Sequence, residues 1–234
     1  MQKPKIPFTA ILLAGGDSKR MGMNKAFLRL GRERLVDIIF RKLDKLFSEV
    51  IIVADCWQEF SYLPARFTGD LLKNGQKCAL RGIHAGLSLA TYPSSFILGC
   101  DMPFLSLPLI RYMSHFAAGY DIVVPRLEGY YQPLFAFYNK STLESIARQL
   151  REKKLKITGF YAYSRIKEIG EEAIKCFDPQ LFSFFNVNMR DNYLLAKKLY
   201  RLPQPALALP QGCNATNNTP NTPGEGANLC HENG

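Results

Sequence analysis

A short apolar segment that runs into a glycine-rich, basic loop is the feature that most constrains this chain. Residues 8–13 read Phe-Thr-Ala-Ile-Leu-Leu, and residues 13–25 read Leu-Ala-Gly-Gly-Asp-Ser-Lys-Arg-Met-Gly-Met-Asn-Lys. A short apolar run that is bounded by a proline and by glycines is typical of a buried strand. Open α/β sheets bind their ligands at the carboxyl ends of such strands. We therefore expect a ligand site where the first strand ends.

The next segments predict a βαβ unit. Apolar residues recur at helical spacing along one face between residues 35 and 47, and the apolar run 50–53 follows directly. A strand, a helix and a second strand in so few residues make the two strands parallel neighbours.

The same reasoning extends to the rest of the chain. Strands are predicted at 96–98, 122–124 and 134–138, helices at 83–90, 107–116, 140–152 and 190–200, and irregular structure at 56–82. Continuous apolar strands that alternate with helices are typical of a mostly parallel sheet covered on both faces. The sequence therefore predicts an α/β chain with three layers, α/β/α.

Composition separates a basic body from a polar tail. The first 201 residues carry all 30 Lys and Arg and 18 of the 20 Asp and Glu. A basic body favours an anionic partner, either a phosphorylated small molecule or a nucleic acid, although scattered charges also simply solvate a surface. Residues 203–234 hold five prolines and six asparagines, which predicts a disordered tail after a domain at 1–202.

Several classes of protein are disfavoured by what the sequence lacks. It has no run of 18 apolar residues, and its first residues do not resemble a secretory signal. Its six cysteines show no metal-ligand spacing and are typical of reduced thiols in a cytosolic protein. No zinc, RNP or helix-turn-helix signature is present. We expect a cytoplasmic protein whose partners include neither a membrane nor a nucleic acid.

The loop after the first strand has the composition of a phosphate site. Gly15 and Gly16 allow the backbone to approach a ligand and to turn its N–H groups toward phosphate oxygens. Arg20 and Lys25 add two cations, one able to grip a phosphate with two bonds and one mobile. The spacing fits neither a Walker A motif nor the Rossmann fingerprint. Two glycines alone would indicate an ordinary turn, but the added cations favour phosphate binding.

A carboxylate follows the predicted strand 96–98. Residues 99–104 read Gly-Cys-Asp-Met-Pro-Phe, so that Asp101 lies just beyond the end of a buried strand. An Asp before a proline often only caps a turn. Mg²⁺, however, prefers oxygen ligands and commonly takes one or two carboxylates together with substrate phosphates. In combination with the glycine-rich loop, Asp101 is therefore predicted to hold Mg²⁺ for a nucleotide phosphate.

These motifs resemble the molybdenum cofactor guanylyltransferases, a branch of the nucleotidyltransferases, over about residues 8–200. The resemblance rests on residues 13–25 and 99–104, on Gln132-Pro133-Leu134 and on Phe185-Asn-Val-Asn before the last helix. It implies a Rossmann-like nucleotidyltransferase fold. It also implies transfer of GMP from GTP to the phosphate of molybdenum-bearing molybdopterin, with release of pyrophosphate.

The resemblance also implies roles for individual residues. The nucleotide would contact Leu13, Ala14, Gly15, Gly16 and Asp70, its phosphates would bind Arg20 and Lys25, Asp101 would hold Mg²⁺, and Asn186 and Asn188 would line the acceptor side. Catalysis would then rest on Lys25, Arg20 and Asp101. Because the attacking phosphate oxygen is already anionic, positioning and electrostatic stabilisation would suffice without a strong general base.

The sequence departs from the family pattern at four places. Asn24 replaces an Asp, residues 79–82 replace a Gly-Pro-Leu-x-Gly segment, Val53-Ala54-Asp55 lacks an Asn, and Met189-Arg190-Asp191 replaces a Thr-Pro-Glu entry to the last helix. Two alternatives therefore stay open. One is a cytidylyltransferase acting on the same cofactor, or a nucleotidyltransferase for another small phosphate. The other is a non-catalytic nucleotide-binding partner of molybdoenzymes or their chaperones.

Overall fold

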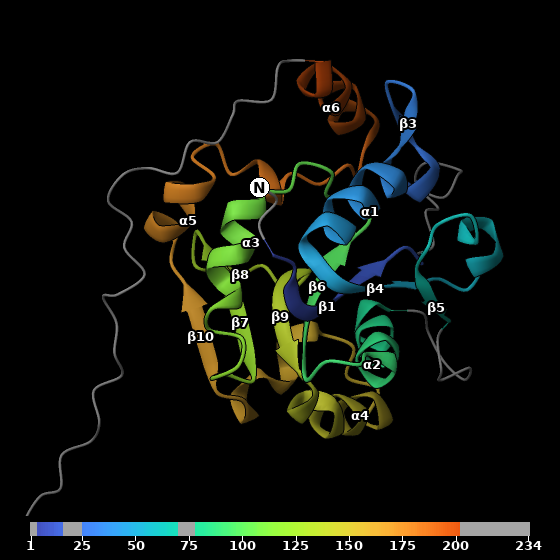
Figure 1. The fold of residues 1–234 in the computed structure, drawn as a ribbon. Helices are drawn as coiled ribbons and strands as arrows, with labels where there is room; N and C mark the ends of the chain where they lie inside the picture. The colour runs from blue at the N-terminus through green and yellow to red at the C-terminus, as the bar shows by residue number, and fades with distance from the viewer. Residues whose placement is uncertain (1–3, 16–24, 70–77, 202–234) are drawn as a thin grey trace, which may run out of the picture.

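The first strand lies inside an eight-stranded sheet (Figure 1). The structure is a computed structural model that describes residues 4–15, 25–69 and 78–201. Within these residues the strand order is β10 (Ile166–Ile169), β7 (Ile122–Leu127), β9 (Phe135–Asn139), β6 (Ser94–Gly99), β1 (Ile6–Leu13), β4 (Phe47–Val53) and β5 (Arg66–Thr68). A short strand, β8 (Tyr130–Tyr131), pairs with β7 at the side.

The sheet is mostly parallel, as the sequence predicts. β1 pairs in parallel with β4 on one side and with β6 on the other, which confirms the βαβ unit. β9 is antiparallel to both of its neighbours, β6 and β7. In register, Leu13 lies opposite Val53 and Gly99. The carboxyl ends of three neighbouring strands are therefore level at one edge of the sheet.

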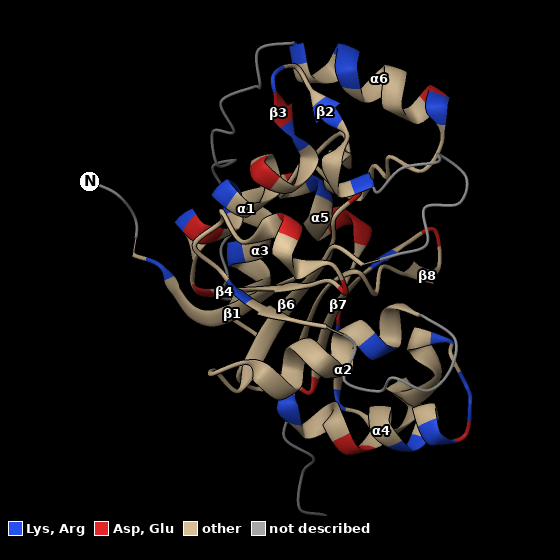
Figure 2. Ribbon diagram, turned by 90° about the vertical axis from the view of Figure 1, so that its right-hand side faces the viewer, with Lys and Arg blue, Asp and Glu red and all other residues tan. Residues whose placement is uncertain are grey.

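Helices cover both faces of the sheet and confirm the three layers (Figures 1 and 2). α1 (Leu35–Leu46), α3 (Leu107–Ser114) and α5 (Glu171–Phe177) lie on one face, and α2 (Ala79–Leu89) and α4 (Leu143–Arg151) lie on the other. Alternate side chains of a strand point to opposite faces. Accordingly, Leu12 packs in one core cluster with Ile39 of α1, and Ile11 packs in the other with Ile83 of α2.

A smaller lobe stands beyond the sheet. The short helix η1 (Lys25–Phe27) leads into an antiparallel hairpin of β2 (Arg29–Leu30) and β3 (Glu33–Arg34), and α6 (Arg190–Arg201) lies beside this hairpin (Figures 1 and 2). A separate apolar cluster joins them and contains Leu28, Leu30, Leu35, Ile38, Phe104, Val187 and Ala196. We call the hairpin together with α6 the clamp lobe.

Some elements differ from the sequence prediction. Residues 56–82 were predicted to be irregular, which is wrong in part, because they contain the short helix η2 (Trp57–Phe60), β5 and the first turn of α2. β10 and α5 were not predicted at all. Helix 140–152 begins as a 3₁₀ turn, η3 (Lys140–Thr142), before α4. The proposed tail at 203–234 lies outside the described residues and stays a prediction. None of the described helices is long and apolar enough to cross a membrane.

Candidate functional site

The end of β1 is held by hydrogen bonds to both neighbouring strands. The N–H of Ala14 donates to the carbonyl oxygen of Val53 at 2.9 Å, and the N–H of Cys100 donates to the carbonyl oxygen of Leu13 at 3.1 Å. Gly15 follows as an exposed residue at the sheet edge. This backbone therefore reaches the edge in a fixed position. Gly16 and Arg20, the next predicted site residues, lie outside the described part of the chain, as does Asp70.

Lys25, Asp101 and Asn188 come together at this edge from three different segments. The Nζ of Lys25 donates to Oδ1 of Asn188 at 2.6 Å across 163 positions of sequence. The same Nζ lies 3.8 Å from Oδ2 of Asp101. The side chains of Lys25 and Asp101 are 19% and 21% exposed, so both remain open to a ligand. A cation, a carboxylate and an amide thus share one small polar site.

Asp101 is placed by the loop that follows β6. Its carbonyl oxygen accepts a hydrogen bond of 2.8 Å from the N–H of Val187. Burial raises the pKa of its carboxyl group, and the positive charge of Lys25 acts in the opposite direction. Burial also raises the pKa of the neighbouring Cys100 thiol to about 12. Cys100 is therefore protonated near neutral pH and is not equipped to act as a nucleophile.

The two asparagines of the Asn-Val-Asn segment make different contacts. Asn186 donates from its side-chain nitrogen to the carbonyl oxygen of Phe184 at 3.2 Å, and its own carbonyl accepts from Nδ2 of Asn192 at 3.1 Å. These bonds shape the turn before α6. Asn188, in contrast, reaches Lys25 with its side chain. Asn188 is therefore the member of the pair that joins the polar site directly.

The Gln132-Pro133-Leu134 motif supports the same edge. The N–H of Gly99 donates to the carbonyl oxygen of Leu134 at 3.3 Å, and the hydroxyl of Tyr138 donates to the carbonyl oxygen of Pro133 at 2.9 Å. Since β9 runs antiparallel to β6, the start of β9 lies beside the end of β6. The motif thus contacts the backbone that leads to Asp101.

Sequence reasoning missed the residues that hold the loops together. Ser106 donates from its hydroxyl to the carbonyl oxygen of Phe177 at 2.8 Å, and its N–H donates to the hydroxyl of Ser183 at 2.9 Å. The buried Asp178 carboxylate accepts from the N–H of Ser183 at 2.7 Å. Ser106 could have been noticed, because a Ser two residues before a Pro is a common helix N-cap. Its partners across the chain leave no signal in the sequence.

Lys42 also holds the loop after Asp101 in place and was not predicted from the sequence. Its Nζ donates to the carbonyl oxygen of Pro103 at 3.0 Å, so that α1 anchors the loop after Asp101. Burial lowers the pKa of Lys42 to about 8, and the positive charge of Arg41 adds to the effect.

The donor set of the site suits a hard cation bound together with a phosphate. Among the described residues no group of three or more His, Cys, Asp or Glu converges. One part-exposed carboxylate is nevertheless what Mg²⁺ needs when substrate phosphates and waters complete its shell. Lys25 places a positive charge beside that carboxylate. The arrangement can therefore bind a polyphosphate through a metal ion and a lysine.

Known proteins show the same sequence pattern and fold. A family model described as a MobA-like NTP transferase domain matches residues 10–164. A probable molybdenum cofactor guanylyltransferase of Pelotomaculum thermopropionicum is 38% identical over 81% of this chain and 91% of its own length. The molybdenum cofactor guanylyltransferase of Desulfosudis oleivorans is 34% identical over 78% of this chain and 91% of its own length.

A solved structure agrees with these relatives. Molybdopterin-guanine dinucleotide biosynthesis protein A from Archaeoglobus fulgidus superposes with a TM-score of 0.72 at 26% identity, over 82% of this chain and 97% of the other. The matched family model begins within β1, includes the loop with Asp101 after β6 and ends just before β10. Its agreement with this fold and with relatives that match over most of their length shows that the chain is a nucleotidyltransferase belonging to the MobA-like NTP transferase family.

Proposed function

We propose that this chain transfers GMP from GTP to molybdenum-bearing molybdopterin and releases pyrophosphate. The observation that carries the proposal is the convergence of Lys25, Asp101 and Asn188 at the level ends of β1 and β6. The names of the relatives supply the substrates, because both curated relatives are described as molybdenum cofactor guanylyltransferases.

The nucleotide would lie over the end of β1. The backbone of Leu13, Ala14 and Gly15 would contact it, and Gly16, Arg20 and Asp70 would add the contacts that the family resemblance implies. Because the N–H of Ala14 already donates to Val53, the N–H groups that bind phosphate oxygens would be those of Gly15 and Gly16. Lys25 would hold the triphosphate from the other side of the edge.

Asp101 would hold Mg²⁺, the cation that its single part-exposed carboxylate suits. When bound, the metal would neutralise phosphate charge and so act as a Lewis acid. Near neutral pH the carboxylate must be ionised for this role. The positive charge of Lys25 favours that ionised form and opposes the effect of burial on the pKa of Asp101.

The chemistry needs positioning more than proton transfer. The attacking atom would be a phosphate oxygen of molybdopterin that is already anionic, so no general base is required. The barrier comes from bringing two anions together and from the charge that collects on the leaving pyrophosphate. A fixed ammonium such as that of Lys25 stabilises this charge without rearranging. Asn186 and Asn188 would face the acceptor.

A direct assay tests the proposal. The purified chain is incubated with Mg²⁺, molybdenum-bearing molybdopterin and either GTP, CTP or ATP, and both pyrophosphate and the dinucleotide cofactor are quantified. We expect turnover with GTP to exceed turnover with CTP and ATP by at least about tenfold, since a base-specific hydrogen bond is worth that much. The Lys25→Ala variant serves as the control for a contaminating activity.

The other outcomes identify the alternatives. Faster turnover with CTP would make the chain a cytidylyltransferase for the same cofactor. Nucleotide binding without pyrophosphate release would indicate a non-catalytic partner of molybdoenzymes or their chaperones. Thermal shifts with each nucleotide and Mg²⁺ measure the binding separately, because a ligand that prefers the native state raises its stability.

A further inference from the structure

We propose that the clamp lobe positions Lys25 and Asn188 for GMP transfer, with Tyr193, Tyr200 and Glu33 as positioning residues. The inference rests on the proposed function and concerns residues that do not themselves reach the polar site. It begins from the contacts between residues 25–33, which lead into the hairpin, and residues 188–200, which lead into and include most of α6.

Three hydrogen bonds join these two segments. The first is the hydrogen bond from Lys25 to Asn188. The second runs from the hydroxyl of Tyr193 to the carbonyl oxygen of Arg29 at 2.8 Å. The third runs from the hydroxyl of Tyr200 to Oε2 of Glu33 at 2.7 Å. The bonds of Tyr193 and Tyr200 therefore join α6 to the hairpin, and the bond of Asn188 joins the segment before α6 to Lys25 at the polar site.

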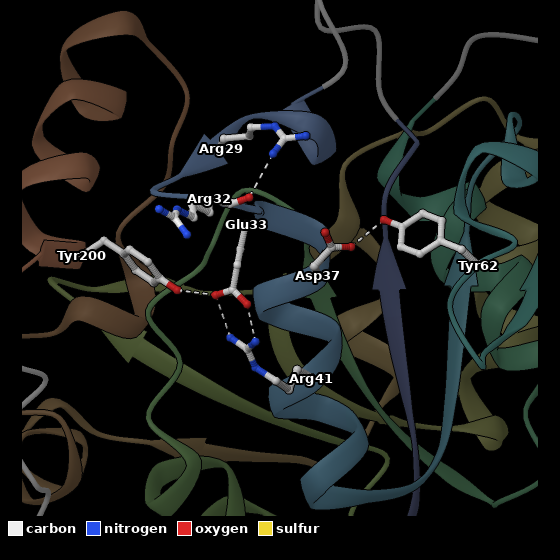
Figure 3. A network of polar contacts seen from close by, with 7 residues as sticks. All are labelled: Arg29, Arg32, Glu33, Asp37, Arg41, Tyr62 and Tyr200. Carbon is white, nitrogen blue, oxygen red and sulfur yellow. Dashed lines mark hydrogen bonds and ion pairs between the residues drawn. The ribbon is translucent and has the colours of Figure 1, made fainter.

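Glu33 attaches the hairpin of the clamp lobe to α1. Both of its carboxylate oxygens accept from the guanidinium of Arg41 on α1, one of them at 2.9 Å (Figure 3). The bonds from Arg41 and Tyr200 lower the pKa of Glu33 to about 2, against the effect of burial. α1 packs on the sheet. The bidentate ion pair between Arg41 and Glu33 therefore attaches the hairpin, and through Tyr200 also α6, to the sheet domain.

The hairpin turn also fits the ring of Tyr200. Gly31 has a φ of +62°, a conformation that glycine adopts without strain. A Cβ atom at this position would lie 3.7 Å from Cε1 of Tyr200, so the ring packs against the turn itself. Arg29 braces the same turn by donating to the carbonyl oxygen of Arg32 at 2.9 Å (Figure 3).

Besides these bonds, α6 is held by the apolar packing of Ala196 and of the part-buried Tyr193, Leu199 and Tyr200. Ala196 is its one fully buried residue, and Leu194 and Leu195 remain 48% and 46% exposed. Because this apolar contact is limited, we expect the helix to become more mobile when its polar anchors are removed. Asn188 lies two residues before the start of this helix, so its position is tied to that of the helix. Loss of the tyrosine hydroxyls should therefore loosen Asn188, and with it the ammonium of Lys25.

The test uses Tyr193→Phe, Tyr200→Phe and the double variant, all of which retain the packed rings. Tyr163→Phe is the matched control, since Tyr163 is 71% exposed and its ring stacks on Arg148 on a different helix. Hydrogen exchange by mass spectrometry is read in the peptides that cover residues 185–193. We expect faster exchange there in the double variant and no change in the control. Unchanged hydrogen exchange of these peptides in the double variant would show that the two hydroxyls do not hold Asn188 in place.

Kinetics then separate positioning from a general loss of structure. The double variant should show kcat lowered by about five- to tenfold, the scale of one lost hydrogen bond, with KM for GTP changed less than twofold. In an Asn188→Ala background the same two substitutions should lower kcat no further, because they act through Asn188. An additive loss in that background would overturn the positioning role.

The two proposals fail in different ways. If the wild-type chain transfers no GMP, the proposed function fails, and the exchange measurement still decides whether the tyrosines hold Asn188 in place. If transfer proceeds but the double variant exchanges and reacts as the wild type does, the clamp is wrong and the proposed function stands.

Discussion

A Cβ atom on Gly99 would lie 2.8 Å from Oδ1 of Asp101, closer than such atoms approach in folded proteins. The absence of a side chain at position 99 therefore gives the Asp101 carboxylate its place at the sheet edge. The contact involves the far end of a side chain that can rotate, so a larger residue would turn the carboxylate away rather than break the fold.

The Gly99→Ala variant tests this relationship. We expect kcat to fall by about tenfold or more, as for other misplaced catalytic groups, while the melting temperature changes little. Gly86→Ala is the matched control, because its Cβ would meet Cγ2 of Ile11 at 2.5 Å in the packed core. That variant should lose about 1–3 kcal/mol of unfolding free energy and retain its kcat when folded. Equal losses of stability in both variants would contradict the assignment.

Lys25 should act through its positive charge, and Asp101 through the metal ion that it would hold. Lys25→Ala should lower kcat about a hundredfold or more, because a fixed charge strengthens as the leaving phosphate becomes negative. Its effect on KM for GTP should be smaller. Asp101→Ala should abolish turnover, and added Mg²⁺ should restore little. Steady-state kinetics decide, and a Lys25→Ala variant with raised KM and unchanged kcat would show that the lysine only binds substrate.

The regular part of the fold could be predicted because its signals are local. The apolar run before the glycine-rich loop gives β1, and the stripe between residues 35 and 47 gives α1 within one residue of its end. β5 was missed because three residues, Arg66–Thr68, are too few to show the period of a strand. Its pairing with β4 comes from the tertiary structure.

The candidate site, too, could be predicted from the sequence only in part. Lys25 and Asp101 each follow a recognisable strand, so the sequence could place both at one edge of the sheet. The bond from Lys25 to Asn188 spans 163 positions and was not predicted, since the family resemblance placed Asn188 only on the acceptor side of the site. Lys42 and Glu33 had no signal at all, since a lysine and a glutamate on amphipathic segments are ordinary surface residues until the partner elements are known.

Glu49 should make stability depend on pH. Burial alone would raise its pKa, but hydrogen bonds from Thr9, Thr91 and Arg66 together lower the pKa to about 2. Because the pKa is lower in the folded than in the unfolded chain, the contribution is complete above about pH 4.5 and is lost as the pH falls toward 2. Glu49→Gln should lose about 2–3 kcal/mol of unfolding free energy at pH 7 and progressively less below pH 4.5.

Denaturant titrations at pH 7, 4.5 and 2.5 measure this difference. Glu144→Gln is the control, because the Glu144 side chain is 83% exposed and its pair with Arg151 lies on the surface. That variant should stay within about 0.5 kcal/mol of the wild type at every pH. A Glu49→Gln loss that does not change between pH 7 and 2.5 would show that the carboxylate charge is not the cause.

Ser94 and Ser95 are adjacent in β6, are 1% and 0% exposed, and have opposite hydrogen-bonding status. The hydroxyl of Ser94 donates to the carbonyl oxygen of Ala117 at 2.9 Å and accepts from Nδ2 of Asn139 at 3.1 Å. The hydroxyl of Ser95 has no partner among the residues that the structure describes. Ser94→Ala should therefore lower the unfolding free energy by about 1–3 kcal/mol, since it removes a buried hydrogen bond to Ala117 and a part-buried one from Asn139. Ser95→Ala should leave it unchanged or raise it by about 1 kcal/mol, because a buried hydroxyl without a partner is itself unfavourable. Parallel denaturant titrations compare the two variants, and a larger loss in Ser95→Ala than in Ser94→Ala would show that the Ser95 hydroxyl is bonded in solution.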